Sequence, residues 1–260
     1  MLRIRIGVQL ASLRLPFKQA LLRAAELGAE AVEIDARGEI RPRELSQTGV
    51  RHLRKMLEDY NLRVCAVGFR TRHGYNVYEN LDRRVAATKE AMELANKLGC
   101  GVVVNHVGRV PADDKGPEWQ LLVETLADLC AHGQRVGSTL VARTGSESGE
   151  DLATLIAALP QGSLGVDFDP GSLIVNGFSV RDAAMALGEN VLHVHATDGV
   201  RDLAQGRGTQ TPLGQGAVDF PELLGILEEH RYGGYFTVER PMSEKPLLEI
   251  RQAINYLRSF

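Results

Sequence analysis

Short runs of β-branched and apolar residues alternate with longer amphipathic segments along the whole 260-residue chain. The longer segments carry apolar residues at helical spacing, and several end on glycine, as residues 17–27 do at Gly28. A strand followed by a helix, repeated many times, predicts a parallel sheet, because each helix returns the chain to the same edge. Eight such units of about 32 residues predict one (β/α)8 barrel.

The expected element boundaries follow from this alternation. We expect strands at 4–9, 31–35, 63–68, 101–105, 139–143, 165–168, 191–195 and 235–238, and helices at 17–27, 43–60, 82–98, 118–135, 149–159, 180–187, 221–230 and 247–259. No linker or low-complexity segment interrupts the pattern, so residues 1–260 are expected to form a single domain. A doubly wound open sheet is the alternative, but its phosphate-binding pattern G-x-G-x-x-G is absent.

Composition limits the classes of binding partner and the cellular compartment that we expect for this protein. A net charge of -3 provides no global basic field, so we expect no nucleic-acid partner. The cysteines Cys65, Cys100 and Cys130 are far apart and form no C-x-x-C pair, which favours reduced core residues. No apolar run is long enough for a signal peptide or a membrane span. We therefore expect a cytoplasmic protein with no membrane partner, and a homo-oligomer remains open.

Polar residues at the ends of the predicted strands are the candidates for chemistry, because the carboxyl ends of barrel strands converge on one site. They are Gln9, Glu33 or Asp35, Arg70, Asn105, His106, Arg143, Asp169, His195 and Glu239. Asp169, His195 and Glu239 offer the oxygen and nitrogen ligands that suit Mn²⁺, Mg²⁺, Co²⁺ or Zn²⁺. The alternative is structural: Asp169 caps a turn, His195 is a hydrogen-bonded core residue, and Glu239 pairs with Arg240 or Arg143.

Four further residues are candidates for binding a substrate. His106 and Asn105 end one strand, and His73 belongs to a polar cluster after another. Arg207 lies between two glycines in the long segment 199–219, and a connection of that length in a barrel is usually a functional loop. A solvated arginine and a charged surface turn are the plainer explanations for Arg207 and His73.

The alternation of side chains along a strand makes a further prediction. Asp167 and His193 should face the same way as Asp169 and His195, one layer deeper in the barrel. A buried acid and a buried imidazole there should pair. Such a pair could also orient His195.

Four motifs in the second half resemble the xylose isomerase-like TIM barrels. They are Val-Asp-Phe-Asp-Pro-Gly at 166–171, His-Val-His-Ala-Thr-Asp at 193–198, Pro-Leu-Gly-Gln-Gly-Ala-Val-Asp-Phe at 212–220 and Gly-Gly-Tyr-Phe-Thr-Val-Glu at 233–239. The resemblance implies a sugar or sugar-phosphate isomerase or epimerase. It also implies a divalent metal held by Glu, Asp, His and Glu, with the two glutamates moving a proton through an enediolate. Asp169, His195 and Glu239 match the last three of these positions.

Arg143 stands where the family pattern has its first glutamate. A guanidinium about 4 Å from a divalent ion would be repelled by about 8 kcal/mol at an effective dielectric constant near 20. Either Arg143 swings aside and water completes a three-ligand site, or Arg143 fills the metal position and itself polarises a carbonyl. In the second case a salt bridge would lower the basicity of Glu239, and Glu239 would be the only glutamate left as a base.

Three functions follow from these observations. The first is an isomerase or epimerase for a small sugar or polyol, with Glu239 and Arg143 as catalytic residues. The alternatives are a divergent, metal-free protein that binds carbohydrate and a dehydratase or lyase of the same superfamily. The endonuclease branch of the superfamily is disfavoured, because Ser172 stands where that branch has a metal-binding histidine.

Overall fold

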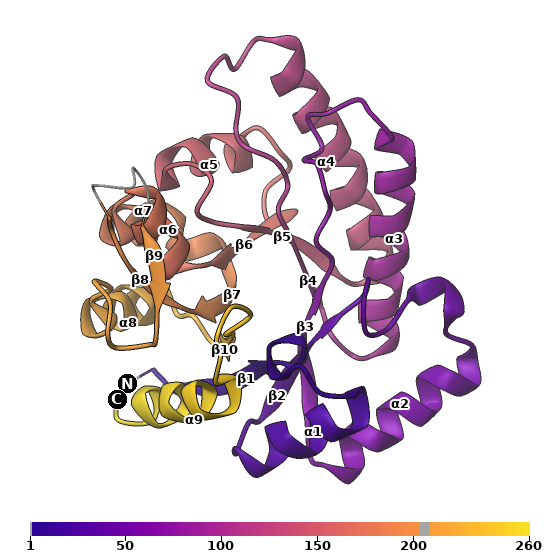
Figure 1. The fold of residues 1–260 in the computed structure, drawn as a ribbon. Helices are drawn as coiled ribbons and strands as arrows, with labels where there is room; N and C mark the ends of the chain where they lie inside the picture. The colour runs from indigo at the N-terminus through magenta and orange to yellow at the C-terminus, as the bar shows by residue number, and fades with distance from the viewer. Residues whose placement is uncertain (1, 203–207) are drawn as a thin grey trace.

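The computed structural model describes residues 2–202 and 208–260 of the chain. Eight parallel strands close into a barrel in the order β1-β10-β7-β6-β5-β4-β3-β2 (Figure 1). They are β1 (Arg5–Gln9), β2 (Ala31–Asp35), β3 (Arg63–Gly68), β4 (Val102–Asn105), β5 (Thr139–Arg143), β6 (Leu164–Phe168), β7 (Val191–Ala196) and β10 (Tyr235–Val238). The predicted (β/α)8 barrel is confirmed.

Helices surround the barrel, and the two chain ends lie side by side at its edge (Figure 1). They are α1 (Phe17–Glu26), α2 (Gln47–Asp59), α3 (Leu81–Lys97), α4 (Pro117–Val136), α5 (Gly149–Ala157), α6 (Pro170–Asn176), α7 (Val180–Leu187), α8 (Phe220–Glu229) and α9 (Pro246–Leu257). None of the helices in the described residues combines the length and the apolar character needed to cross a bilayer.

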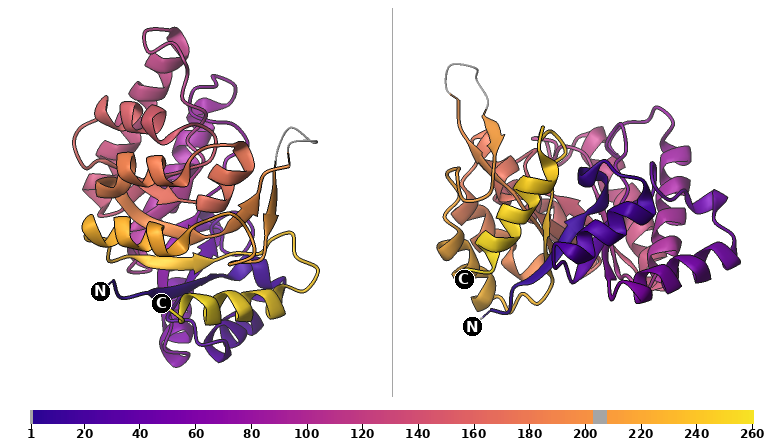
Figure 2. Two further views of the ribbon diagram at one scale, coloured as in Figure 1. Left: turned by 90° about the vertical axis from the view of Figure 1, so that its left-hand side faces the viewer. Right: turned by 60° about the horizontal axis from the view of Figure 1, so that its bottom comes forward.

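Three features differ from the sequence-based boundaries. Residues Pro42–Glu44 form a separate 3-10 turn, and α2 starts only after Ser46, whose side chain accepts a hydrogen bond from the Gly49 amide. The short helix α6 stands where a turn was expected. The segment after β7 contains an antiparallel hairpin of β8 (Asp198–Val200) and β9 (Thr209–Thr211), which extends away from the barrel (Figure 2).

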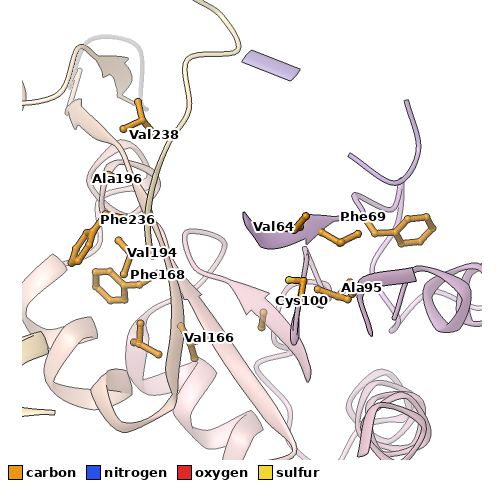
Figure 3. Close-up of a cluster of buried hydrophobic side chains, with 14 of the residues drawn as sticks. Val64, Phe69, Ala95, Cys100, Val166, Phe168, Val194, Ala196, Phe236 and Val238 are labelled. Carbon is orange, nitrogen blue, oxygen red and sulfur yellow. The ribbon is translucent and has the colours of Figure 1, made fainter. Parts of the chain in front are cut away.

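Side-chain alternation divides the barrel into an apolar outside and a partly polar inside. Phe168, Val194 and Phe236 are fully buried outside the barrel among apolar neighbours (Figure 3). Their sequence neighbours therefore point inward. On β3, β4 and β5 the inward residues Ala66, Val104 and Val141 are apolar and form a small separate cluster, and β5 ends on the inward-pointing Arg143. On β6, β7 and β10 they are acids, histidines and a threonine, which need partners inside the barrel.

Candidate active site at the barrel mouth

Arg143 joins two carboxylates at the carboxyl end of the barrel. Its Nε and Nη2 lie 2.8 and 2.6 Å from Oδ2 of Asp169, and its Nη1 lies 3.1 Å from Oε2 of Glu239. Nη2 also donates to the second oxygen of Glu239. All three side chains are buried. The guanidinium thus bridges the acids of β6 and β10, the arrangement expected if Arg143 fills the position of a metal.

Both acids have other donors. Asp169 caps α6 by accepting from the Ser172 amide at 2.9 Å, and it accepts further bonds from the hydroxyls of Ser172 and Thr197. Glu239 accepts from Gln9 at 2.9 Å and from Arg70 at 3.1 Å. The structural alternative expected Asp169 to cap a turn and Glu239 to pair with Arg143. Both contacts are present.

The surroundings of Arg143 and Glu239 shift their pKa values in opposite directions. Burial would raise the pKa of Glu239, but the charges of Arg143, His195 and Arg70 and the bond from Arg143 lower it well below the usual range. Burial would lower the pKa of Arg143, but Asp169, Glu239 and Asp167 raise it further. The guanidinium is permanently charged, and Glu239 is a poor proton acceptor, as the salt bridge predicts.

A deeper layer of polar side chains lies beneath this cluster. Asp167 accepts from Nδ1 of both His193 and His195 at 2.8 Å, which confirms the predicted pairing of Asp167 with His193 and the orientation of His195. Nε2 of His193 lies 2.8 Å from the Thr237 hydroxyl. Nε2 of His195 lies 2.7 Å from Oε2 of Glu33 on β2, which is separated from β7 by the strands β1 and β10.

The charges of this layer fix the protonation state of His195. Burial and Arg143 would lower its pKa, but Asp167, Glu33 and Glu239 raise it to about 10. His195 is therefore an imidazolium at neutral pH. The pKa of Glu33 is lowered: burial raises it, but the charge and the hydrogen bond of His195 outweigh that effect. Glu33 and His195 form a buried ion pair.

A cavity of about 490 Å³ opens beside this pair at the barrel mouth. Its lining combines two carboxylates with two guanidinium groups, and consists of Gln9, Ala11, Glu33, Asp35, Arg37, Gly38, Gly68, Arg70 and Pro241. Gln9 spans the carboxylates of the two layers, because its amide donates to Glu33 at 3.0 Å and to Glu239 at 2.9 Å. Carboxylates and guanidinium groups in a cavity of this size suit a small polyhydroxylated ligand.

The four expected substrate-binding residues lie in different places. Asn105 is fully buried and uses its amide on Thr71 and on the Tyr75 hydroxyl, 2.7 Å away. His106 is half-buried, and its pKa is lowered to about 4 by burial and by the charges of Arg143 and Arg70, so it is neutral near pH 7. His73 lines a different cavity, and Arg207 lies outside the described residues.

Glu33 and Gln9 were candidates only as strand-end residues, and the structure gives them a larger part. Glu33 touches the cavity, His195 and Gln9. The only sequence signal for it was its place near the end of a strand whose neighbour is Asp35. Its presence corrects one inference from the sequence: Glu239 is not the only glutamate at the mouth when Arg143 fills the metal position.

The residues present do not form the four-ligand metal site that the resemblance implies. Arg143 occupies the first position and uses Asp169 and Glu239 as its own partners. A different group could hold a metal ion: ligand atoms of Glu33, His193 and His195 all lie within 4.8 Å of one another. In that group both ring nitrogens of His193 already have partners, so a metal would have to displace Thr237 or Asp167.

Comparison with known proteins agrees with the fold and the motifs. The family model described as "Xylose isomerase-like TIM barrel" matches residues 21–260. An inosose dehydratase from Clostridium beijerinckii is 22% identical over 93% of this chain and 89% of its own. A xylose isomerase domain protein from Planctomyces limnophilus superposes with a TM-score of 0.87 at 24% identity, over 98% of this chain and 96% of its own. IOLI protein, solved with a bound zinc atom, superposes with a TM-score of 0.79 at 18% identity, over 98% and 96%. The chain therefore belongs to the xylose isomerase-like TIM-barrel family.

Proposed function

We propose that this protein is an enzyme that isomerises or epimerises a small sugar or polyol ketone through an enediolate at the barrel mouth. The fixed cation of the reaction is Arg143. The observation that carries the proposal is the buried guanidinium held between Asp169 and Glu239, two residues that the resemblance to the family implies as metal ligands. A positive charge beside a bound carbonyl stabilises the oxyanion that forms when the neighbouring carbon loses a proton.

Arg143 retains a hydrogen-bond donor for such an oxyanion. A guanidinium has five N–H groups. Four bonds to Asp169 and Glu239 are formed by Nε, Nη1 and Nη2, so one N–H on Nη1 has no partner among the described residues. Its planar geometry is fixed by the two acids, so little reorganisation is needed when the charge develops.

Glu33 is the better base of the two mouth glutamates. Glu239 is held by Arg143 and Arg70, and its lowered pKa makes proton uptake unfavourable. The pKa of Glu33 is also lowered, by His195, but Glu33 has no arginine partner among the described residues, lines the cavity, and faces the imidazolium of His195 with one oxygen. We assign proton removal from the substrate to Glu33, and keep the earlier assignment to Glu239 as the alternative that mutation can test.

Dehydration is the second candidate reaction. The similarity to an inosose dehydratase over 93% of this chain favours it. Removal of a proton next to the carbonyl by Glu33 would again give an enolate. If the next carbon carries a hydroxyl group, the electrons of the enolate expel it, and a proton converts the departing hydroxide into water. The first step is common to both reactions, so the residues assigned above serve either one.

The metal hypothesis for Asp169, His195 and Glu239 makes the opposite prediction about chelators. If Arg143 swings aside and these three residues bind an ion, chelation should abolish activity. If Arg143 is the cation, the chelated protein should remain active. The sharpest test is proton NMR in deuterated water, with chelator-treated protein and a panel of ketoses and keto-inositols.

Deuterium incorporation next to the carbonyl reports enolate formation even when no product accumulates. We expect the chelator-treated protein to incorporate deuterium, and the rate of incorporation to fall at least about 100-fold in Glu33→Gln. A new isomer or a dehydrated product would then identify the reaction. Absence of exchange with every ketone, or exchange only after metal is returned, would contradict the proposal.

A further inference from the structure

A second cavity, of about 640 Å³, lies next to the barrel mouth and is lined by the loops that follow β2 and β3 and by α3. Arg37 lines both this cavity, here called the arginine cleft, and the mouth cavity that contains Glu33. The arginine cleft is lined by Arg37, Arg41, Pro42, Arg43, Glu44, Phe69, Thr71, Arg72, His73, Glu79, Asn80, Arg83, Arg84, Ala87 and Glu90. A ligand in the mouth cavity therefore has the cleft as its immediate neighbour.

The charge of the arginine cleft is opposite to that of the whole chain. Its lining has six arginines and three glutamates, which gives a formal charge of +3, while the chain carries -3. Two arginines are neutralised locally, Arg41 by Glu44 at 3.0 Å and Arg43 by Glu90 at 2.7 Å. The remaining positive charge is concentrated on the other four.

Two of those four guanidinium groups are held by backbone carbonyls and not by acids. Arg84 donates to the carbonyls of Glu79 and Gly74, at 2.6 and 2.9 Å, which fixes its position against the loop after β3. Arg37 donates to the carbonyl of Arg70. These bonds orient the cations without cancelling their charge, so both remain able to attract an anion.

Arg72 and Arg83 are exposed and have no hydrogen-bond or ion-pair partner among residues 2–202 and 208–260. Four unneutralised guanidinium groups around one cavity, two of them fixed in place, are suited to bind the oxygens of a phosphate monoester or a carboxylate. The mouth cavity differs, because Glu33 and Asp35 there suit hydroxyl groups, which donate to carboxylates.

We infer that the substrate is bipartite: its hydroxy-ketone part occupies the mouth cavity, and an anionic group at its far end is bound in the arginine cleft. This inference rests on the proposed function for the position of the reacting part. The anionic group is a phosphate monoester or a carboxylate. It anchors the substrate at a point separate from the chemistry, so its binding energy can position the hydroxy-ketone next to Arg143 and Glu33.

The test compares two double variants with the same change in charge. Arg72→Ala/Arg83→Ala removes the two free cations of the cleft. Arg54→Ala/Arg63→Ala removes two exposed arginines that line a cavity at the amino end of the barrel. Each variant removes exposed side chains, so both should fold, and thermal melting checks this. Titration calorimetry with inorganic phosphate at low ionic strength then measures anion binding.

We expect phosphate to bind the unmodified protein. Its dissociation constant should rise about tenfold or more in Arg72→Ala/Arg83→Ala and stay unchanged in Arg54→Ala/Arg63→Ala. Glycerol 3-phosphate and glycerate should each compete with phosphate, and the tighter competitor identifies the anionic group, whereas glycerol should not compete. No phosphate binding, or an equal loss in both double variants, would overturn the inference.

Failure of this inference and failure of the proposed function give different results. Phosphate titration requires no catalysis. If chelated protein exchanges the protons of neutral ketoses but binds no phosphate in the cleft, the proposed reaction stands and the bipartite substrate is rejected. If phosphate binds in the cleft but no ketone undergoes exchange, the anion site stands and the enediolate reaction is rejected.

Discussion

Replacing Arg143 with glutamate should convert the site to one that requires a metal. The variant Arg143→Glu restores the ligand set Glu, Asp, His and Glu that the family pattern contains. Without a metal it should be strongly destabilised, because Asp169 and Glu239 are buried and lose the cation that bridges them. Removing one partner of a buried ion pair costs about 3–5 kcal/mol. At about 2–4 °C per kcal/mol, the melting temperature should fall by roughly 6–20 °C.

A divalent ion should reverse part of that loss. An ion present at 100 times its dissociation constant stabilises the folded state by about 2.7 kcal/mol, which raises the melting temperature by roughly 5–11 °C. The assay is thermal unfolding of chelator-treated protein with added Mn²⁺, Mg²⁺, Co²⁺ or Zn²⁺, together with metal analysis of the dialysed sample. We expect one bound ion per chain in Arg143→Glu and a response that increases with metal concentration.

The control is Arg143→Leu, which loses the cation and gains no ligand. It should be destabilised by a similar 3–5 kcal/mol and show no response to metal. The reasoning would be refuted if no divalent ion stabilised Arg143→Glu. It would also be refuted if the unmodified protein bound one ion per chain and gained as much stability from it as the variant.

Three further outcomes follow from the site. Glu33→Gln should lower kcat for deuterium exchange by about 100-fold or more, and Glu239→Gln by less; the reverse order in steady-state rates would return the role of base to Glu239. The raised pKa of His195 stabilises the fold fully below pH 6.5, and this contribution is lost as the pH rises through about 10. Urea unfolding across that range should show stability falling, and His195→Gln should flatten the decline. Asp198→Ala should cost about 1.5–3 kcal/mol in urea unfolding, because its buried carboxylate accepts from the amides of residues 199, 214, 216 and 218; a change below 0.5 kcal/mol would contradict this.

The strand ends were predictable because the barrel imposes a simple rule on them. Strand β5 ends on Arg143 and β7 contains His195 with the boundaries expected to within one residue, so the convergence of these side chains followed from the fold. The pairing of Asp167 with His193 followed from side-chain alternation alone, because both lie on adjacent strands in register. Each of these predictions needs only the two-residue period of side chains along a strand and the identity of the adjacent strand.

Contacts across the barrel axis could not be predicted in this way. Glu33 on β2 reaches His195 on β7, although the two strands β1 and β10 lie between them. Their relative height depends on barrel stagger and on an irregularity in the pairing between Val32 and Glu33, and neither has a sequence signature. The arginine cleft was missed for a similar reason, because it combines the loops after β2 and β3, which the sequence separates by α2.

The exchange of glutamate for Arg143 becomes intelligible when the charges are compared. A divalent ion together with the glutamate that helps to bind it contributes a net charge of +1 to the site. Arginine alone also contributes +1. Asp169, His195 and Glu239 can therefore be retained in an environment of the same net charge, and their burial does not become more costly. What changes is the kind of contact offered to a substrate.

A metal offers a substrate an open coordination position, whereas Arg143 offers a directed N–H group. An oxyanion can use either one, so the substitution is compatible with enolate chemistry. The same equality explains why Arg143→Glu should regain a stable site only when a divalent ion accompanies it.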